Sequence, residues 1–318
     1  MTVMVKEMKK IATRDSYGKA LVELGKEYEN LVVLDADLAA ATKTGIFKKE
    51  FKNRHFDCGI AEANMMCIAA GMSTIGLVPF ASTFAMFAAG RTFEQIRNTI
   101  AYSRLNVKIG ATHGGISVGE DGASHQCCED FALMRSIPGM VVLSPSDDVE
   151  ARAAVKSAYK HNGPVYLRFG RLQVPVFHDE DDFIFEIGKG EILNEGNDVA
   201  IIATGIMVHE AIEAGKILKS QGIYARVINM CSIKPLDNEL ILNAAKECKK
   251  IVTCEEHSII GGLGDAVSGY LSQVHPVVVR KIGVNDEFGH SGPAVELLKQ
   301  FGLCADNIVN EVKELLQK

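Results

Sequence analysis

The stretch Asp57-Cys-Gly-Ile-Ala-Glu62-Ala-Asn-Met65 places a carboxylate between the expected end of a strand and an apolar segment. That segment is rich in Ala and Met, and we expect a buried helix over residues 61–72. Glu62 then lies in the first turn, where the helix dipole and the free N–H groups favour an acid whether or not it has a function. The alternative is that apolar surroundings hold the carboxylate against a basic ring nitrogen of a ligand, through one buried hydrogen bond.

Three phenylalanines follow in the stretch Pro79-Phe-Ala-Ser-Thr-Phe84-Ala-Met-Phe87. Phe80, Phe84 and Phe87 are spaced by four and three residues, so they share one face if this segment is helical. Such a face ordinarily packs into the core. The alternative is a wall on which a heteroaromatic ring stacks, which contributes about 1 kcal/mol beyond burial. The local sequence does not distinguish the two interpretations.

A loop at residues 112–126 combines glycines with histidines and acids. The residues in question are Gly114, Gly115, Gly119, Gly122, His113, Glu120, Asp121 and His125. Glycine lets the backbone turn sharply and approach a ligand closely. Histidines and carboxylates suit hydrogen bonding to a polyol and proton transfer. We therefore predict a ligand-binding loop rather than a solvated turn.

Three arginines, Arg14, Arg168 and Arg171, are candidates for binding an anion. A guanidinium binds phosphate through two parallel hydrogen bonds, although any single arginine is more commonly a surface ion-pair partner.

Two further motifs predict no chemistry. Gly261-Gly-Leu-Gly264 lacks the full dinucleotide fingerprint and indicates a tight turn before a helix. Glu255-Glu-His257 lacks the second histidine of a zinc-protease helix.

Strand and helix patterns alternate along the whole chain. We expect helices over 15–29 and from Asp147 onward, and strands at 31–34, 106–110, 140–143 and 164–169. Further strands are expected near residues 198, 225, 250 and 276, with helix-length segments between them. This pattern predicts an α/β protein of two domains, each a mostly parallel sheet with helices on both faces. The change of composition at 172–190 favours a first domain at 1–175, a linker at 176–190 and a second domain at 191–318.

Composition and charge exclude several classes of function. The 318 residues are 47% hydrophobic and 23% charged with a net charge of −6, so we expect no nucleic-acid partner. No apolar run approaches the roughly 20 residues that cross a bilayer, and residues 1–10 lack a signal-peptide core, so we expect no membrane association. The eight cysteines form no CxxC pair, which predicts free thiols in a reducing cytoplasm. His125, Cys127 and Cys128 are a poor set of metal ligands, and we predict no metal site in this chain.

The three motifs around Glu62, Phe84 and His113 resemble, in this order, the pyrimidine-binding domain of transketolases. The resemblance extends over essentially all 318 residues, including the stretch from Glu255 to Asp265. It implies that thiamine diphosphate binds between this domain and the diphosphate-binding domain of another subunit. The Gly-Asp-Gly motif of that other domain is not found here, since Gly264-Asp265-Ala266 lacks the second glycine. The chain is thus similar to the C-terminal subunit of split transketolases.

The resemblance implies a role for several side chains near the cofactor. Glu62 matches the glutamate that hydrogen-bonds the aminopyrimidine ring and favours its imino tautomer. Phe84 and Phe87 match the aromatic pocket around this ring, with Gly90 where a third aromatic residue is common. Asp37 matches an acid near the cofactor at the subunit interface.

Other matches imply contacts to the substrate. His125 and Asp121 match residues that contact sugar hydroxyls, and His113 matches one toward the phosphate end. Arg14 and Arg171 match the two phosphate-binding arginines. Ala41 stands where a serine commonly assists them, and we expect Thr42 or Thr44 to substitute for it. The expected catalytic residues are Glu62, His113 and His125.

The implied function is transfer of a two-carbon ketol unit from a ketose phosphate, such as xylulose 5-phosphate, to an aldose phosphate, such as ribose 5-phosphate. The implied partner is an N-terminal-type subunit that carries the diphosphate-binding domain and ligates Mg²⁺ or Ca²⁺. The implied assembly is an α2β2 heterotetramer in which this chain also self-associates.

Two alternatives stay open. One is a related thiamine enzyme, either 1-deoxyxylulose-5-phosphate synthase-like or the beta subunit of a 2-oxoacid dehydrogenase. Thr112-His113 and the stretch from Glu120 to His125 favour a transketolase over both. The other is a non-catalytic binding protein on the same fold, for which the departures at Ala41 and Gly90 leave room.

Overall fold

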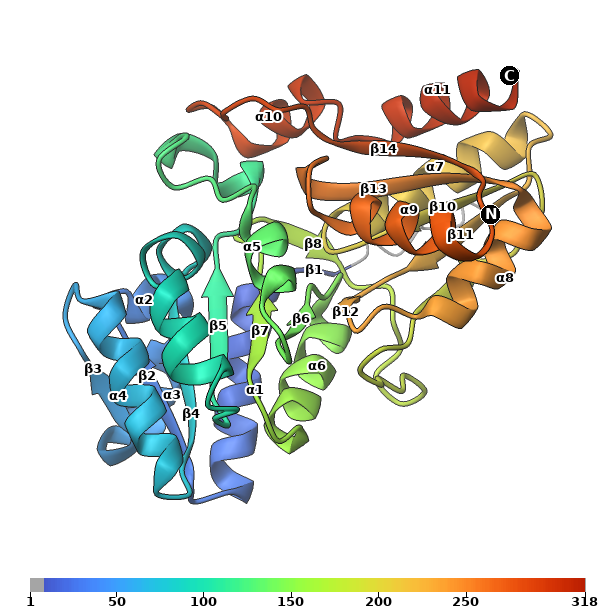
Figure 1. The fold of residues 1–318 in the computed structure, drawn as a ribbon. Coiled ribbons are helices and arrows are strands. Elements are labelled where there is room, and N and C mark those ends of the chain that lie inside the picture. Colours follow the sequence, from blue (N-terminus) through green and yellow to red (C-terminus); the bar gives the residue numbers. More distant parts are fainter. Residues whose placement is uncertain (1–8, 318) are drawn as a thin grey trace.

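The computed structural model describes residues 9–317, which form two sheets flanked by helices (Figure 1). The larger sheet has the strand order β12-β6-β7-β5-β4-β2-β3, and its pairs are parallel except β12 with β6. Its strands are β2 (Leu31–Asp35), β3 (His55–Asp57), β4 (Val78–Phe84), β5 (Lys108–Thr112), β6 (Val141–Leu143), β7 (Val165–Arg168) and β12 (Ser232–Lys234). Because β12 comes from the C-terminal half of the chain, the two halves share this sheet.

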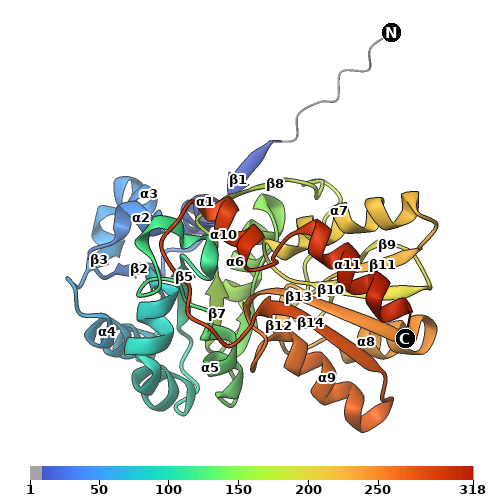
Figure 2. The ribbon, with the colours of Figure 1, turned by 90° about the horizontal axis from the view of Figure 1, so that it is seen from above.

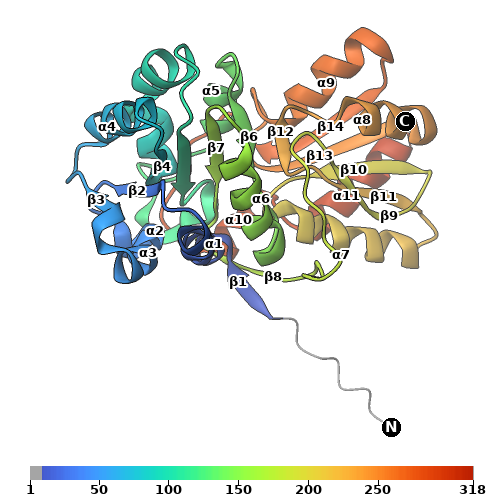
Figure 3. The same ribbon diagram turned by 90° about the horizontal axis from the view of Figure 1, so that it is seen from below.

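Helices cover both faces of the larger sheet, as Figure 3 shows from below. One face packs against α1 (Thr13–Glu27), α3 (Thr44–Glu50) and α6 (Asp148–Lys160). The other packs against α4 (Glu62–Thr74), the π-helical segment η3 (Gln95–Ala101) and α5 (Asp130–Ser136). Residues 31–34 of β2 alternate between these two cores, so this run, buried on both faces, is wholly apolar. The short helices of this half are α2 (Ala39–Thr42), η1 (Lys52–Arg54), η2 (Phe87–Arg91) and η4 (Ile116–Asp121).

The smaller sheet has the order β14-β13-β10-β11-β9 and is parallel except for β9. Its strands are β9 (Glu191–Asn194), β10 (Val199–Ala203), β11 (Ala225–Asn229), β13 (Lys250–Ser258) and β14 (Val278–Val284). On one face lie α8 (Asn238–Cys248) and α9 (Leu263–Val274), and on the other α7 (Met207–Ser220) and α11 (Ala305–Leu316). The remaining helix, α10 (Ala294–Gln300), contacts η4 of the first half, and Figure 2 shows it reaching toward the larger sheet.

The structure confirms the predicted fold class and the predicted strand and helix positions to within a few residues. Asp147 caps α6 as expected, because its side chain accepts a hydrogen bond from the N–H of Glu150. The sequence pattern missed β4, where a helical face was considered instead. It also missed the short antiparallel additions, namely β9, β12 and the ribbon of β1 (Lys10–Ala12) with β8 (Gln173–Pro175). Residues 176–190, the predicted linker, contain no helix or strand. The exact domain boundaries stay a prediction.

None of the helices within residues 9–317 combines the length and the apolar character that a membrane span needs. The prediction that no signal peptide is present falls on the first residues, of which 1–8 lie outside the described part. All eight cysteines are free thiols, and five of them are buried.

Candidate active site at the carboxyl edge of the larger sheet

Glu62 is the first residue of α4 and follows the end of β3. Its side chain is only 6% exposed, and its Oε1 accepts a hydrogen bond from Nη1 of Arg91 at 2.8 Å. Sequence reasoning missed Arg91, whose own side chain is half exposed. Among the described residues, no hydrogen bond engages Oε2 of Glu62. The carboxylate therefore keeps acceptor capacity for a ligand.

The aromatic wall is formed by Phe84 and Phe87, whose stacked rings have centroids 5.6 Å apart. Phe84 ends β4 and Phe87 begins η2, so the segment is a strand followed by a helix. The single helical face considered for the three phenylalanines is therefore wrong. Phe80 points into the core beside Tyr17 and takes no part in the wall.

A third group takes part in the wall where the sequence has Gly90. The guanidinium of Arg91 lies 3.9 Å from the centroid of the Phe87 ring. Cation–π contacts of this kind hold a guanidinium flat on an aromatic face. Both Phe87 and Arg91 belong to the π-helical turn η2, a geometry that is frequent at functional sites. Arg91 thus links the aromatic wall to Glu62.

His113 follows β5 and extends the wall, since its ring stacks on Phe84 at 3.9 Å between centroids. Its Nε2 lies 2.9 Å from Nη1 of Arg14, and its Nδ1 lies 2.9 Å from Oγ1 of Thr112. Because a guanidinium can only donate, Nε2 must be the acceptor and the ring proton belongs on Nδ1. Burial, helped by Arg14 and Arg171, lowers the pKa of His113 to about 3. The ring is therefore a neutral acceptor at physiological pH.

We expect His113 to stay neutral between about pH 5 and pH 8, where an ordinary histidine changes charge. The reason is that burial and the neighbouring cations both disfavour its protonated form. The measurement is the ¹⁵N chemical shifts of the His113 ring across this range. Replacing Arg14 with alanine should raise the pKa of His113, since one of the cations is lost. A normal titration near pH 6.5 in the unchanged protein would contradict the assignment.

Cations gather beside His113. Arg14 also donates to the carbonyl oxygen of Ala41 at 3.2 Å, and Arg171 donates to the carbonyl oxygen of Val118. Burial lowers the pKa of Arg14, and the nearby charge of Arg171 adds to this effect. Lys43, which sequence reasoning missed, is a third cation that lowers the pKa of His113. Three positive charges near one histidine suit a phosphate group.

The two threonines expected to replace a phosphate-binding serine are not available for that role. Thr42 and Thr44 are fully buried, and both donate to Oδ2 of Asp35, at 2.7 and 2.8 Å. Asp35 also accepts the N–H of Leu38. These hydrogen bonds fix the turn after β2, so the threonines shape the loop and the expectation of a phosphate contact was wrong.

The remaining predicted residues lie at the same edge with fewer contacts. Asp121 is exposed and lies 4.0 Å from Nη1 of Arg171. His125 pairs its Nδ1 with Oγ of Ser124 at 2.9 Å and meets the Phe87 ring edge-on at 5.3 Å. Asp37 is exposed, and its N–H donates a hydrogen bond to Oδ1 of Asp57 at 3.1 Å. Asp37 therefore stands apart from the chain of contacts that runs from Glu62 to Arg14.

Arg168, predicted as a candidate anion clamp, has a structural role instead. It is 5% exposed and its Nε lies 2.9 Å from Oδ2 of Asp130, itself fully buried. A guanidinium whose charge is already paired in the interior cannot bind an anion from solvent.

The site as a whole can hold a flat basic ring beside an anionic polyol. One end has a buried carboxylate and an aromatic wall, and the other has a neutral histidine among three cations. Within residues 9–317, no group of three or more His, Cys, Asp or Glu side chains is arranged to hold a metal ion. This combination lies at the carboxyl ends of parallel strands, where α/β proteins ordinarily bind their ligands.

Comparisons with known proteins identify the family of this chain. Residues 9–176 match the family model of the transketolase pyrimidine-binding domain, and residues 188–308 match that of the transketolase C-terminal domain. The chain therefore belongs to the transketolase family.

Three relatives illustrate this membership. A provisionally named transketolase C-terminal section of Methanocaldococcus jannaschii is 51% identical, with 96% of each chain covered. A 6-deoxy-6-sulfo-D-fructose transketolase subunit of Clostridium sp. (strain MSTE9) is 41% identical over 96% of this chain and 94% of its own. A solved split gene transketolase, an inactive beta4 tetramer, is 53% identical with a TM-score of 0.90, covering 96% of this chain and 99% of that one.

Proposed function

We propose that this chain is the pyrimidine-binding subunit of a two-chain transketolase. The observation that carries the proposal is the continuous series of contacts from Glu62 through Arg91, Phe87, Phe84 and His113 to Arg14. It unites a carboxylate with a free acceptor oxygen, an aromatic wall and a cationic end in one site. Membership of the transketolase family supports thiamine diphosphate as the cofactor.

The residues present fit the aminopyrimidine ring of thiamine diphosphate. Oε2 of Glu62 would accept a hydrogen bond from the ring, and Phe84 and Phe87 would pack on its face. When bound, the cofactor supplies the nucleophilic carbon and the electron sink for ketol transfer. The chain itself supplies placement, exclusion of water by the two phenylalanines, and the carboxylate that favours one tautomer of the ring. We assign the diphosphate and its Mg²⁺ or Ca²⁺ to the partner subunit.

The histidines and arginines would bind the sugar phosphate and transfer its protons. Arg14 and Arg171 would bind the phosphate, which would draw Arg14 away from Nε2 of His113. The freed Nε2 would then accept a hydrogen bond from a sugar hydroxyl. His125 would move protons at its Nε2, since Ser124 engages its Nδ1. Asp121 would accept from another hydroxyl of the donor.

The donor and acceptor we propose are xylulose 5-phosphate and ribose 5-phosphate. Two relatives, a 6-deoxy-6-sulfo-D-fructose transketolase subunit and an apulose-4-phosphate transketolase subunit, carry names that point to other sugars. A panel that includes these two sugars therefore belongs in the assay. We further propose a cytoplasmic location, which the free thiols support, and a domain division at residues 176–190.

The test is ketol transfer from xylulose 5-phosphate to ribose 5-phosphate with thiamine diphosphate and magnesium. We expect the chain alone to be inactive, because the sequence lacks the Gly-Asp-Gly motif and we assign the diphosphate and its metal to the partner subunit. Activity should appear when a purified diphosphate-binding subunit is added, in a complex we propose to be α2β2. The inactive beta4 tetramer of the split gene relative supports the first expectation. Activity of the chain by itself, or an inactive but stable mixed complex on every sugar, would contradict the proposal.

A further inference from the structure

The loop that carries the proposed substrate contacts is held in place by a carboxylate from the other half of the chain. Oε1 of Glu256, on β13, accepts a hydrogen bond from the N–H of Ser117 at 2.5 Å. Glu256 is 4% exposed. Its carboxyl carbon would lie 2.3 Å from a Cβ placed on Gly115, which has a φ of 86°. The loop therefore fits closely around this carboxylate, and a side chain at 115 would collide with it.

A second buried group joins the same loop to the same strand. Nη2 of Arg168 donates to the carbonyl oxygens of Glu256, at 2.8 Å, and of Cys127, at 3.1 Å. The N–H of Gly115 also donates to the Cys127 carbonyl, at 2.8 Å. Asp130 balances the charge of Arg168. Arg168 therefore links the turn after His113, through Cys127, to the backbone of β13.

The far end of the loop meets the C-terminal half again. Nε2 of Gln126 donates to the carbonyl oxygens of Ile116, at 3.1 Å, and of His290, at 3.0 Å. Gly122 packs against Ser291, where a Cβ would lie 2.5 Å from Oγ. Both ends of the segment between His113 and Gln126 therefore depend on residues of the C-terminal half.

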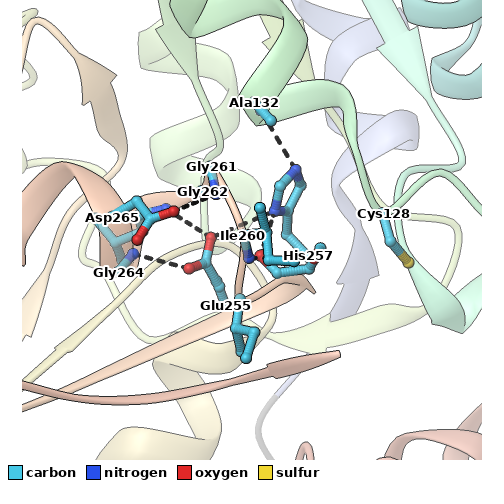
Figure 4. Close-up of polar contacts among 12 residues, drawn as sticks. Cys128, Ala132, Glu255, His257, Ile260, Gly261, Gly262, Gly264 and Asp265 are labelled. Carbon is cyan, nitrogen blue, oxygen red and sulfur yellow. Dashed lines mark hydrogen bonds and ion pairs between the residues drawn. The ribbon is translucent and has the colours of Figure 1, made fainter. Parts of the chain in front are cut away.

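The neighbouring acid on β13, Glu255, contacts a different part of the protein. Alternate residues of a strand face opposite sides, and Glu255 accepts the N–H groups of Leu263 and Gly264 at the start of α9, at 2.6 and 2.8 Å. Figure 4 shows Glu255 with Gly264, and His257 reaching Ala132 on α5. Glu255 is as deeply buried as Glu256 but does not touch the loop.

We propose that Glu256 is a positioning residue that holds the loop of residues 114–121, and through it His113 and Asp121, in the geometry the substrate requires. The expected effect on substrate binding rests on the proposed function, whereas the expected effect on the structure of the loop does not. His113 has a left-handed backbone with a φ of 58°, a conformation that persists only when its surroundings enforce it. Glu256 and Arg168 enforce this backbone conformation through their contacts with the residues that follow His113. The C-terminal half would in this way take part in substrate binding without touching the substrate.

Hydrogen exchange in the full chain tests the structural part without any need for activity. We expect Glu256→Ala to speed exchange of the amides at 114–119 by about tenfold or more, because Ser117 loses a charged acceptor. Glu256→Gln keeps an oxygen acceptor and should restore protection to within about threefold of the unchanged chain. Glu255→Ala is the matched control, and it should loosen residues 261–265 while leaving 114–119 unchanged.

Equal exchange at 114–119 in the Glu256→Ala and unchanged chains would overturn the proposal, as would equal loosening by Glu255→Ala. If Glu256→Ala fails to fold, Gly115→Ala provides a second route, since its Cβ must displace the same carboxylate. It too should loosen 114–119 locally, and unchanged exchange there would count against the proposal.

Kinetics of the complex with the partner subunit test the catalytic part. Glu256→Ala should raise the KM for the phosphorylated donor by about tenfold while kcat falls by less than about threefold, because Glu62 and the aromatic wall are untouched. Glu256→Gln should recover most of the KM, and Glu255→Ala should change neither constant. A loosened loop in a protein that transfers no ketol unit at all would refute the proposed function and leave the positioning role standing. An active enzyme whose KM is unchanged by Glu256→Ala would refute the catalytic consequence.

Discussion

Replacing Glu62 with alanine is expected to lower the turnover of the assembled enzyme by at least about 100-fold. The free energy of unfolding should change little, because the carboxylate engages one half-exposed arginine rather than a buried network. The loss would follow from the missing hydrogen bond to the cofactor ring, which is a contact to the reacting group. Turnover at saturating cofactor and the urea midpoint of the variant measure the two effects separately.

Two controls sharpen this test. Glu62→Gln keeps the shape and an oxygen acceptor but removes the charge, so an intermediate loss is expected. Glu94→Ala removes an exposed glutamate that accepts a hydrogen bond from Asn98, and should leave turnover unchanged. Near-normal turnover in Glu62→Ala would exclude this residue from catalysis and remove the main support for a thiamine site.

The fold was predictable from the sequence because several of its buried parallel strands contain short apolar runs. The run Leu31-Val-Val-Leu34 contributes to two cores at once, and such a run has few other solutions. β12 could not be predicted, because a strand of three residues is too short to show a periodic pattern. It also joins the edge of the larger sheet, whose other strands all come from the first half of the chain. The spacing of Phe80 and Phe84 was compatible with one helical face, yet both residues lie in β4. Residues four apart share a face in a strand as well as in a helix, so spacing alone cannot separate the two.

The candidate site was predictable where its side chains follow strand ends. Phe84 ends β4, His113 directly follows β5, and Glu62 begins the helix after β3. The carboxyl ends of such parallel strands meet at one edge of the sheet. Arg91 was missed because it reaches the site from within a helical segment of ordinary composition, and Lys43 because it lies in the short turn between α2 and α3. The role of Thr42 and Thr44 could not be predicted because it depends on Asp35. This buried carboxylate at the end of β2 accepts a hydrogen bond from each threonine, so both point inward.

Replacing Arg14 with alanine is expected to reduce kcat/KM for a phosphorylated donor by about 100-fold, the size of two lost charge-assisted hydrogen bonds. A donor without phosphate should be affected far less. Hydroxypyruvate is such a donor, and the ratio of kcat/KM for xylulose 5-phosphate and hydroxypyruvate is the quantity to measure. The loss should appear mainly in KM, because Arg14 lies at the opposite end of the site from Glu62.

The pH of this comparison matters, because Arg14 also helps to keep His113 neutral. Without Arg14 the pKa of His113 should rise from about 3 toward 6.5, yet burial still opposes its protonation. At neutral pH the ring therefore stays an acceptor, and the effect on the phosphate contact is measured alone. Arg14→Lys keeps a charge without the two-pronged geometry and should lie between the other two proteins. Arg97→Ala, at an exposed arginine of η3, serves as the control. An equal loss with both donors would show that Arg14 supports the site as a whole, and the phosphate role would have to be given up.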